Sequence, residues 1–263
     1  MPKVSIITPV YNRPDYLEEA VESIRQQSFT DWEHIIIDDG STNPATKKVL
    51  EKIAKHFKIS IYRINNRGLS GARNFGITKS AGEYILTLDD DDKWHPDFIT
   101  AALNIFEAKQ QTGAVTAWMK EFGLSDRIIK TKGGDVRNFL TENNSAHGIF
   151  KKEHWEKVGG YDEEMKAGYE DWDFWLRLTA SGYNVEVVQE PFFFYRIHRD
   201  SSLYKEAWSK HLSLFRYIVE KNVKVYKENV VDALCLLEQK AVEAQITAES
   251  AGLVGRLKKI LHL

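Results

Sequence analysis

Cysteine is almost absent from this chain, and its scarcity limits how the fold can be held together. The 263 residues contain a single cysteine, Cys235, so an internal disulfide and a zinc site built from paired cysteines are both excluded. Sparse cysteine fits a reducing compartment. We therefore expect a cytoplasmic protein that relies on its hydrophobic core.

Long apolar runs are missing as well, and no basic surplus is present. The first apolar run gives way to polar residues after Val10, so we expect neither a signal peptide nor a membrane-spanning helix. The 36 Lys and Arg residues are balanced by 38 Asp and Glu residues, for a formal net charge of -2. Nucleic acid is not an expected partner, because no excess of positive charge is available to neutralise its phosphates.

Short apolar runs alternate with helical patterns through the first half of the chain. Runs of β-branched residues predict buried strands, and apolar residues at helical spacing predict helices. Such alternation predicts an α/β fold with a doubly wound, mostly parallel, Rossmann-like sheet. The strands are expected at residues 3–10, 33–38, 59–64, 83–88, 114–118 and 184–191, and the helices at 14–27, 43–57 and 95–113.

The second half of the chain has a different pattern. Residues 131–144 lose all periodicity, which predicts an irregular and mobile connection. From residue 204 onward the pattern is almost wholly helical. We expect a core domain over residues 1–202 and a helical C-terminal extension over residues 203–263.

Polar residues follow three of the predicted strands at their carboxyl ends, where ligands bind in sheets of this type. Turn chemistry explains asparagine, glycine and serine at such positions, but it accounts poorly for six carboxylates. The three segments are PVYNR at residues 9–13, DDGS at residues 38–41 and DDDD at residues 89–92.

The four consecutive carboxylates from Asp89 to Asp92 need a compensating charge, because like charges packed this closely repel one another. Two Asp residues separated by one position can hold Mg²⁺ or Mn²⁺ and leave coordination sites for phosphate oxygens. The pair Asp89 and Asp91 and the pair Asp90 and Asp92 both have this spacing. The spacing alone leaves both pairs open.

Arg73 is the next candidate, within NNRGLSGARNFGI at residues 65–77. The guanidinium of Arg67 or of Arg73 suits a phosphate or a carboxylate, and Gly68 and Gly71 allow a close approach of the backbone. The alternative is that Arg73 lies near a helix start and pairs with a nearby Asp.

The segment GYEDWDFWLRL at residues 168–178 combines three carboxylates, Glu170, Asp171 and Asp173, with aromatic residues. A partly desolvated carboxylate is a candidate general base, and Trp172 and Trp175 beside it could support a sugar ring. The alternative is that acidic residues gather at a helix start because the helix dipole favours them. His198 lies in a stretch that looks irregular and carries little weight alone.

In this order, SIITPVYNR, IIIDDGSTN, NRGLSGARNFGI, GEYILTLDDDDKWHP, VGGYDE, GYEDWDFWLRL and YRIHRDS resemble a family 2 glycosyltransferase with a GT-A fold. The resemblance covers about residues 2–202. It implies transfer of a sugar from a nucleoside diphosphate sugar, usually a uridine one, to an acceptor hydroxyl with inversion at the anomeric carbon. Cell-surface polysaccharide or glycan synthesis is the process we expect.

The resemblance also implies roles for individual residues in donor binding. Asp39 is expected to contact the base, and Arg73 belongs to the segment that closes over the nucleotide. Asp89 or Asp90 is expected to reach the ribose or the metal. The residues expected to line the nucleoside pocket are Pro9, Tyr11, Asn12 and Asp39.

The metal and the base follow from the same resemblance. Mn²⁺ or Mg²⁺ is expected on Asp91, with His198 as a further metal or phosphate contact, and Asp171 matches the general base. The quartet departs from the commoner motif, whose second position is small and uncharged. Asp90 is therefore either a second nucleotide contact or a solvated bystander.

Two other functions compete with this interpretation. A D-x-D motif at a strand end also occurs in Mg²⁺-dependent aspartyl phosphatases, but there it typically follows the first strand. A non-catalytic module that binds a sugar nucleotide would lack the base or the metal site.

The expected partners are a nucleotide-sugar donor and a glycan or lipid-linked acceptor. The tail AGLVGRLKKILHL at residues 251–263 mixes apolar and basic residues, which suits an anionic membrane surface at the inner face of the plasma membrane. The alternative is that the tail packs against the core or against a second subunit, as in a homodimer through the C-terminal helices.

Overall fold

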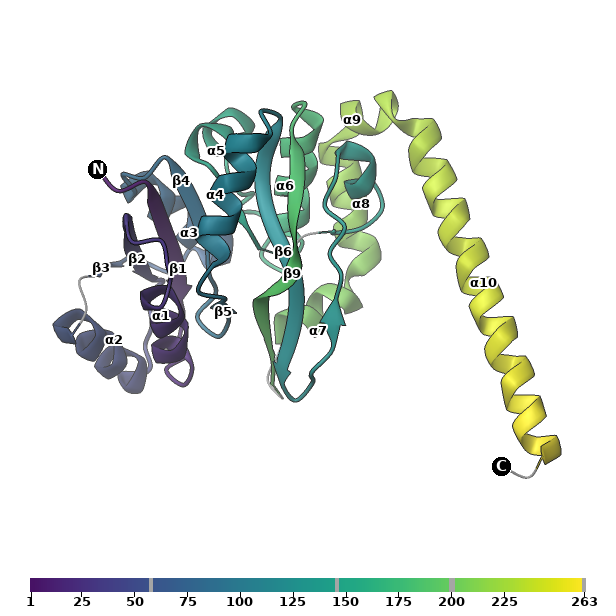
Figure 1. Cartoon of the computed structure of the whole chain (residues 1–263), viewed down its shortest axis with the longest axis horizontal. Coiled ribbons are helices and arrows are strands. Elements are labelled where there is room, and N and C mark those ends of the chain that lie inside the picture. Colours follow the sequence, from purple (N-terminus) through teal and green to yellow (C-terminus); the bar gives the residue numbers. More distant parts are fainter. Residues whose placement is uncertain (57–58, 145–146, 199–201, 262–263) are drawn as a thin grey trace.

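The structure is a computed structural model of the chain and describes residues 1–56, 59–144, 147–198 and 202–261. In these residues a single mixed sheet has the strand order β3-β2-β1-β4-β8-β6-β9-β5, with β7 paired to β6 (Figure 1). Its strands are β1 (Val4–Val10), β2 (Trp32–Asp38), β3 (Ser60–Arg63), β4 (Tyr84–Thr87), β5 (Lys93–Trp94), β6 (Thr112–Gly123), β7 (Ile128–Ile129), β8 (Ile149–Lys151) and β9 (Asn184–Ile197).

Most of the large strand pairs are parallel, as the sequence predicts. β3, β2, β1 and β4 run in one direction, and β6 and β9 are parallel to each other. The short strand β8 lies antiparallel between β4 and β6. In the register, Val10 is paired with Asp38 and Ile7 with Thr87, so the polar segments that follow β1, β2 and β4 meet at one edge of the sheet.

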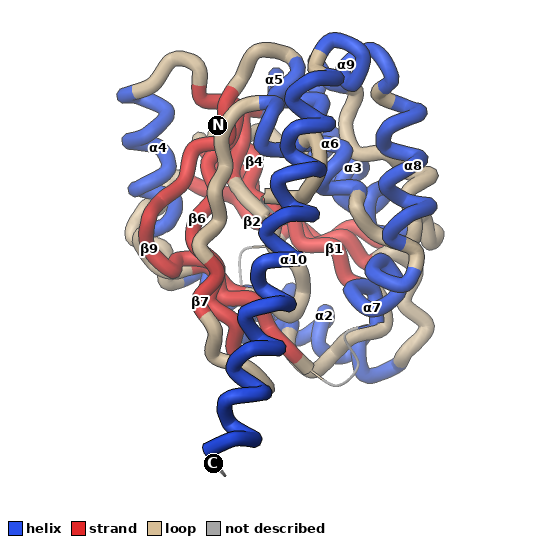
Figure 2. Tube along the Cα trace, turned by 90° about the vertical axis from the view of Figure 1, so that its right-hand side faces the viewer, coloured by secondary structure: helices blue, strands red, loops and turns tan. Residues whose placement is uncertain are grey.

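Helices cover both faces of this sheet. In Figure 2 they flank the strands on either side of the sheet. They are α1 (Leu17–Arg25), α2 (Pro44–His56), α3 (Gly68–Lys79), α4 (Phe98–Ala108), α5 (Lys152–Val158), α6 (Glu170–Ala180), α7 (Ser202–Ser209), α8 (His211–Lys221), α9 (Val223–Glu228) and α10 (Val230–Leu261).

Side chains that alternate along each strand divide the hydrophobic core between the two faces of the sheet. Ile6 of β1 packs with α1 and α4, whereas its neighbour Ile7 packs with α3 and α6. Successive side chains of a strand point to opposite faces, so an apolar run such as β1 is buried on both sides. The helices α1 and α2 share a smaller cluster with β1 and β2. The sheet is thus held rigidly beneath its polar edge.

The connection at residues 131–144 differs from its prediction. Phe139 and Leu140 are fully buried in the core, and a 3-10 helix (Val136–Phe139) begins where Asp135 accepts a hydrogen bond from the backbone N–H of Arg137. The expectation of a mobile connection is therefore wrong for this segment. Its packing partner, Trp172, lies 33 residues away, and its indole N–H donates to the carbonyl oxygen of Phe139 at 2.6 Å.

Two element boundaries also differ from the sequence analysis. α4 ends at Ala108, and Gly113 already lies within β6, which begins at Thr112. β9 continues to Ile197, beyond the end predicted at residue 191, because its second part pairs with β5 and the far end of β6. His198 therefore follows a strand directly, and its neighbourhood is ordered by that sheet.

The C-terminal helices share the core of the residues before them. Ile218 of α8 is fully buried in the same cluster as Trp172, and the hydroxyl of Tyr226 donates to the carbonyl oxygen of Leu140 at 2.8 Å. The division after residue 202 stays a prediction. α10 then runs away from the rest of the molecule (Figure 1), and Cys235 on it is exposed.

The length and the hydropathy of the helices show whether any of them could cross a membrane. Within the described part of the chain, no helix combines the length and the apolar composition needed to cross a bilayer. The predicted tail at residues 251–263 lies outside the part of the chain whose side chains the structure describes.

The burial of Phe139 leads to a stability prediction. Phe139→Ala should lower the free energy of unfolding by about 3–5 kcal/mol, because it removes a fully buried ring and leaves a cavity. Leu124→Ala is the control, since Leu124 is 64% exposed and its loss should change stability by less than about 0.5 kcal/mol. Urea titration measures both. Equal, small effects would mean that residues 131–144 do not pack as described.

Candidate functional site

The four carboxylates occupy the turn between β4 and β5, and aromatic packing holds that turn in place. Trp94 of β5 is 1% exposed, and its ring stacks on Phe98 with centroids 3.9 Å apart. Its indole N–H donates to the carbonyl oxygen of Thr87 at 3.1 Å, which fixes the turn against the end of β4. Trp94 therefore anchors a crowded acidic turn to the core.

Asp91 is held from two sides by cationic or ionisable groups. Its carboxylate contacts the guanidinium of Arg13, which follows β1, and lies 3.1 Å from Nε2 of His198, which follows β9. Burial raises the pKa of Asp91, and Arg13 works against that effect. The structure thus brings together the two residues predicted to hold a metal, although 107 positions separate them.

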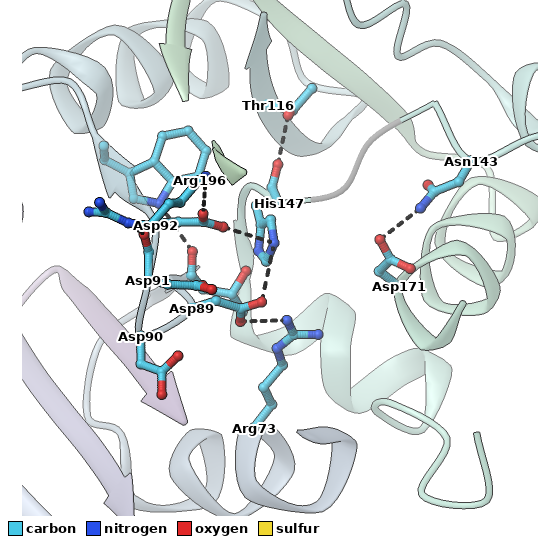
Figure 3. Close-up of polar contacts among 12 residues, drawn as sticks. Arg73, Asp89, Asp90, Asp91, Asp92, Thr116, Asn143, His147, Asp171 and Arg196 are labelled. Carbon is cyan, nitrogen blue, oxygen red and sulfur yellow. Dashed lines mark hydrogen bonds and ion pairs between the residues drawn. The ribbon is translucent and has the colours of Figure 1, made fainter. Parts of the chain in front are cut away.

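Asp90 points to the opposite side from His147 (Figure 3). It is only 7% exposed, and its carboxylate lies 3.4 Å from Arg13. Burial raises its pKa well above the usual value, and the neighbouring Asp91 and Asp89 add to the increase. The alternative of a solvated bystander is therefore wrong, and a nucleotide contact stays a prediction.

Asp89 turns toward Arg73, whose guanidinium donates to it at 2.7 Å. Burial alone would raise the pKa of Asp89, but the charges of Arg73 and His147 outweigh burial and lower it. Nε2 of His147, which precedes β8, lies 3.6 Å from Asp89. This carboxylate is the member of the quartet that its surroundings hold most firmly as an anion.

Asp92 is fully buried and points inward. One oxygen accepts the backbone N–H of Arg196 at 2.8 Å, while the other has no hydrogen-bond partner among the described residues and lies 3.9 Å from His147. Burial, with Asp91 and Asp89 nearby, raises its pKa well above the usual value. Asp89, Asp92 and His147 form a second group of ligand atoms, all within 4.8 Å of one another, that could hold a metal.

Arg73 joins the quartet to α6. Its side chain is 2% exposed, with one terminal nitrogen bonded to Asp89 and the other to Glu170 at 2.8 Å. The two carboxylates raise the pKa of Arg73 although burial opposes them. The alternative stated for Arg73 is a position near a helix start and an ion pair with a nearby Asp. Its place in α3 and its contact with Asp89 agree with that alternative. A direct contact with the nucleotide stays a prediction.

Asp171 lies apart from the quartet, at the start of α6 (Figure 3). One oxygen accepts a hydrogen bond from the side-chain amide of Asn143 at 2.7 Å, and the other accepts the backbone N–H of Trp172 at 2.8 Å. Burial, with Glu170 next in size, raises the pKa of Asp171 to about 7. A carboxylate of this pKa can take up a proton at neutral pH, as a general base must.

These features can be compared with known proteins. The model of glycosyl transferase family 2 matches residues 5–167, and a model described as glycosyltransferase like family 2 matches residues 120–231. The chain belongs to glycosyl transferase family 2. A putative teichuronic acid biosynthesis glycosyltransferase of Bacillus subtilis is 30% identical to it over 206 residues, which cover 76% of this chain and 81% of the relative. An uncharacterized glycosyltransferase of Methanocaldococcus jannaschii is 28% identical over 242 residues, 87% of this chain and 83% of the relative.

Solved structures show the fold of this glycosyltransferase to be GT-A. Residues 1–349 of TarS of S. aureus, solved in complex with UDP-GlcNAc, superpose with a TM-score of 0.66 at 19% identity, covering 77% of this chain and 60% of that TarS fragment. The mannosyltransferase PcManGT of Pyrobaculum calidifontis, solved with GDP-Man and Mn²⁺, gives a TM-score of 0.62 at 18% identity, covering 96% of this chain and 80% of that one. The predicted fold class is thereby confirmed.

The residues predicted for the nucleoside pocket gather at the same edge of the glycosyltransferase sheet. Pro9 is buried within β1, whereas Tyr11 beyond it is 52% exposed. The side-chain oxygen of Asn12 accepts the backbone N–H groups of Thr42 and Asn43, each at 2.8 Å. Asn12 therefore positions the start of α2, and Tyr11 is the member of this set most open to a ligand.

Asp39 positions the start of α3. Its two oxygens accept the backbone N–H groups of Arg67 at 2.8 Å and Gly68 at 2.9 Å. Burial raises the pKa of Asp39, and these two hydrogen bonds work against the increase. Gly68 has a φ of 77°, a conformation that glycine adopts without strain and that lets α3 begin here.

The sequence analysis missed several residues that complete the site. His147 and Asn143 lie in segments with no motif of their own, whereas the two arginines lie within PVYNR and YRIHRDS but were given no role there. A general signal was available, since four adjacent carboxylates require cationic partners, but nothing local says which ones. The four residues are Arg13, Asn143, His147 and Arg196.

The proposed aromatic support for a sugar is wrong. Trp172 is 2% exposed and Trp175 is fully buried, and both pack in the core cluster. They fix α6 from behind and so hold Asp171 in place.

The buried ion pairs of Arg73 predict a large loss of stability on substitution. Arg73→Gln should lower the free energy of unfolding by about 3–5 kcal/mol, because Asp89 and Glu170 then lose their buried counter-charge. The double variant with Glu170→Gln should recover part of that loss. Arg25→Gln, in an exposed ion pair with Glu22, is the control and should cost less than about 1 kcal/mol. A loss for Arg73→Gln no larger than this control in urea titrations would contradict the bridging role.

Proposed function

We propose that this glycosyltransferase moves a sugar from a nucleoside diphosphate sugar, most simply a UDP-sugar, to an acceptor hydroxyl with inversion. The observation that carries the proposal is the separation of two acidic sites by Arg73, with the Asp quartet on one side and Asp171 on the other. Two relatives in the fold comparison were solved with nucleotide sugars, UDP-GlcNAc and GDP-Man. The relative from B. subtilis named for teichuronic acid biosynthesis supports a role in polysaccharide synthesis.

A divalent cation, Mn²⁺ or Mg²⁺, fits the residues at the quartet. Carboxylate and imidazole ligands suit Mn²⁺, and two sets of residues at the quartet supply them. In one of these sets, a fully buried oxygen of Asp92 has no hydrogen-bond partner among the described residues. When bound, such an ion stabilises the negative charge that develops on the departing diphosphate. We assign it to Asp91 and His198, with Asp89, Asp92 and His147 as the alternative set.

In this proposal Arg13 binds a phosphate group of the donor. Its side chain is one-third exposed and contacts both Asp90 and Asp91. A guanidinium in this place can exchange a carboxylate for a phosphate oxygen, because it binds both bidentately. Asp89 and Asp90 then remain for the ribose, and Tyr11 and Asp39 for the base.

Asp171 supplies the base in the transfer step. The acceptor hydroxyl gives its proton to the Asp171 carboxylate while its oxygen bonds to the anomeric carbon, and the bond from that carbon to the diphosphate oxygen breaks. Attack from the face opposite the leaving group inverts the configuration. Asn143 orients the carboxylate by donating to it, and its raised pKa makes it basic enough to take the proton.

The two competing functions fit less well. A phosphatase of the aspartyl type needs an exposed nucleophilic Asp, whereas Asp89 to Asp92 contact Arg13, Arg73 and neighbouring groups. A module that only binds the sugar nucleotide has no use for a separate carboxylate with a pKa near 7.

Nucleotide binding is the direct test of the donor. In the presence of Mn²⁺, the nucleoside diphosphate of the true donor should raise the melting temperature by roughly 5 °C at saturation, because it binds the native state alone. The panel is UDP, GDP, UDP-GlcNAc and GDP-Man. A panel in which no compound shifts the melting temperature would contradict donor binding.

Substitution of the base separates catalysis from binding. Asp171→Asn should lower transfer, or hydrolysis of the donor, by at least about 10²-fold while the nucleotide-induced thermal shift is kept. In the wild type, kcat/KM should rise about tenfold per pH unit below pH 7 and level off above it, since Asp171 must be deprotonated to act. Asp162→Asn, which removes an ion pair with Lys221, is the control and should keep the full rate. If Asp171→Asn lost activity and nucleotide binding together, its role would be structural.

The two metal sets can be told apart by Mn²⁺ binding, without measuring activity. Asp91→Asn should weaken Mn²⁺ binding by at least roughly tenfold in the presence of the nucleoside diphosphate, whereas His147→Gln should change it by less than about twofold. The concentration of free Mn²⁺, read by electron paramagnetic resonance, gives both constants. The reverse pattern would move the ion to Asp89, Asp92 and His147.

A further inference from the structure

A cavity of about 320 Å³ is lined by Asn143, which contacts the proposed base, and has no assigned role. Its buried floor includes Thr116 and Phe193, and its rim comes from residues 129–132 and 142–144. Its volume lies at the lower end of the range for small-molecule sites, which suits about one sugar ring. Polar groups from both the floor and the rim face it.

Two of its lining residues connect it to the two halves of the site. Asn143 on the rim donates to Asp171, and His147 in the floor lies 3.6 Å from Asp89 (Figure 3). Residues that line the cavity therefore contact both the base and the quartet. An acceptor bound there would be near the carboxylate that takes its proton, so this inference rests on the proposed function.

The rim of the cavity carries more positive than negative charge. Lys130 lies over the ring of Trp118 at 4.7 Å, and among the described residues no carboxylate pairs with it. Lys132 lies 3.3 Å from Glu142, which it shares with Lys240 at 3.0 Å. The cavity lining thus contains two lysines, Lys130 and Lys132, and one carboxylate, Glu142, which Lys240 of α10 also contacts. The exposed ammonium groups of Lys130 and Lys132 are available to a ligand.

We propose that this cavity is the acceptor site and that the acceptor carries an anionic group, a carboxylate or a phosphate, close to the hydroxyl that reacts. Lys130 and Lys132 hold that group, Asn143 and Asp171 face the hydroxyl, and the sugar ring rests on the buried floor. Attraction between opposite charges at the rim distinguishes such an acceptor from a neutral sugar of the same size.

The C-terminal extension takes part through a single side chain. Lys240 of α10 donates to the carbonyl oxygen of Thr141 at 3.1 Å as well as meeting Glu142. It therefore fixes the segment that carries Asn143. Because Glu142 contacts both Lys132 and Lys240, its single negative charge neutralises the charge of Lys132 only in part.

The test compares acidic and neutral sugars as ligands of the full chain. Glucuronic acid, glucose 6-phosphate and glucose are titrated with saturation-transfer NMR, with and without the stabilising nucleoside diphosphate and Mn²⁺. At least one acidic sugar should bind roughly fivefold or more tightly than glucose, and the two acids distinguish a carboxylate from a phosphate. The preference should fall as salt rises.

Reversing the charge of Lys130 and Lys132 tests whether these two side chains cause the preference for an acidic sugar. Lys130→Glu with Lys132→Glu should weaken binding of the preferred acid by roughly tenfold and leave glucose within about twofold. Lys47→Glu with Lys48→Glu, on the exposed face of α2, makes the same change of net charge and should leave both unchanged. Lys240→Ala should weaken binding of the preferred acidic sugar and leave the nucleotide-induced thermal shift unaltered.

Three results would overturn the proposal. Glucose could bind as tightly as both acids, or the preference could survive the reversal of Lys130 and Lys132. The reversal could instead abolish nucleotide binding, which would assign the cavity to the donor. Failure of the proposed function has a different signature, since no nucleotide would then shift the wild-type melting temperature, and the sugar titrations without nucleotide can still be read.

Discussion

The site depends on one buried cation. Arg73 reaches from α3 to Asp89 at the end of β4 and to Glu170 at the start of α6, and its side chain is 2% exposed. An arginine cannot shed its charge at any relevant pH, so it must keep both carboxylates beside it. The parallel part of the sheet and the helix that carries Asp171 are thereby fixed relative to each other. The distance between the Asp quartet and the start of α6 is therefore set largely by this one side chain.

Charge divides the acidic residues into two environments with different chemistry. Around the quartet, cationic or ionisable groups arrive from distant segments, and they hold Asp89 firmly as an anion. Asp171 instead has Glu170 as its neighbour and an amide from Asn143, so burial prevails and its pKa rises to about 7. A carboxylate of the first kind is suited to binding cations, and one of the second kind to accepting a proton. The fold produces both within one edge of the sheet.

Much of the fold could be predicted from local sequence, because its signals are local. The apolar run of β1 and the Asn43 cap of α2 need only near neighbours to be recognised. The failures concern partners far away in the chain. Phe139 is buried because Trp172 packs behind it, and β9 continues past Pro191 because a shift in register between Val188 and Phe193 accommodates the proline. Neither partner can be read from the segment itself.

The candidate site follows the same division. Adjacent carboxylates are visible in a sequence because they are adjacent, and so the quartet was predicted as a site, whereas Asp171 was singled out by the family resemblance. His147 has no motif around it, and Arg13, although it lies within PVYNR, was given no role. Their positions still follow from a physical requirement, since four carboxylates at the end of one strand cannot all be buried without partners. The structure meets that requirement by turning the quartet in different directions: Asp89 faces Arg73, Asp91 faces His198, and Asp92 faces inward. At Asp90, burial and the neighbouring carboxylates raise the pKa well above the usual value, and Arg13, 3.4 Å away, is the cation that opposes that rise.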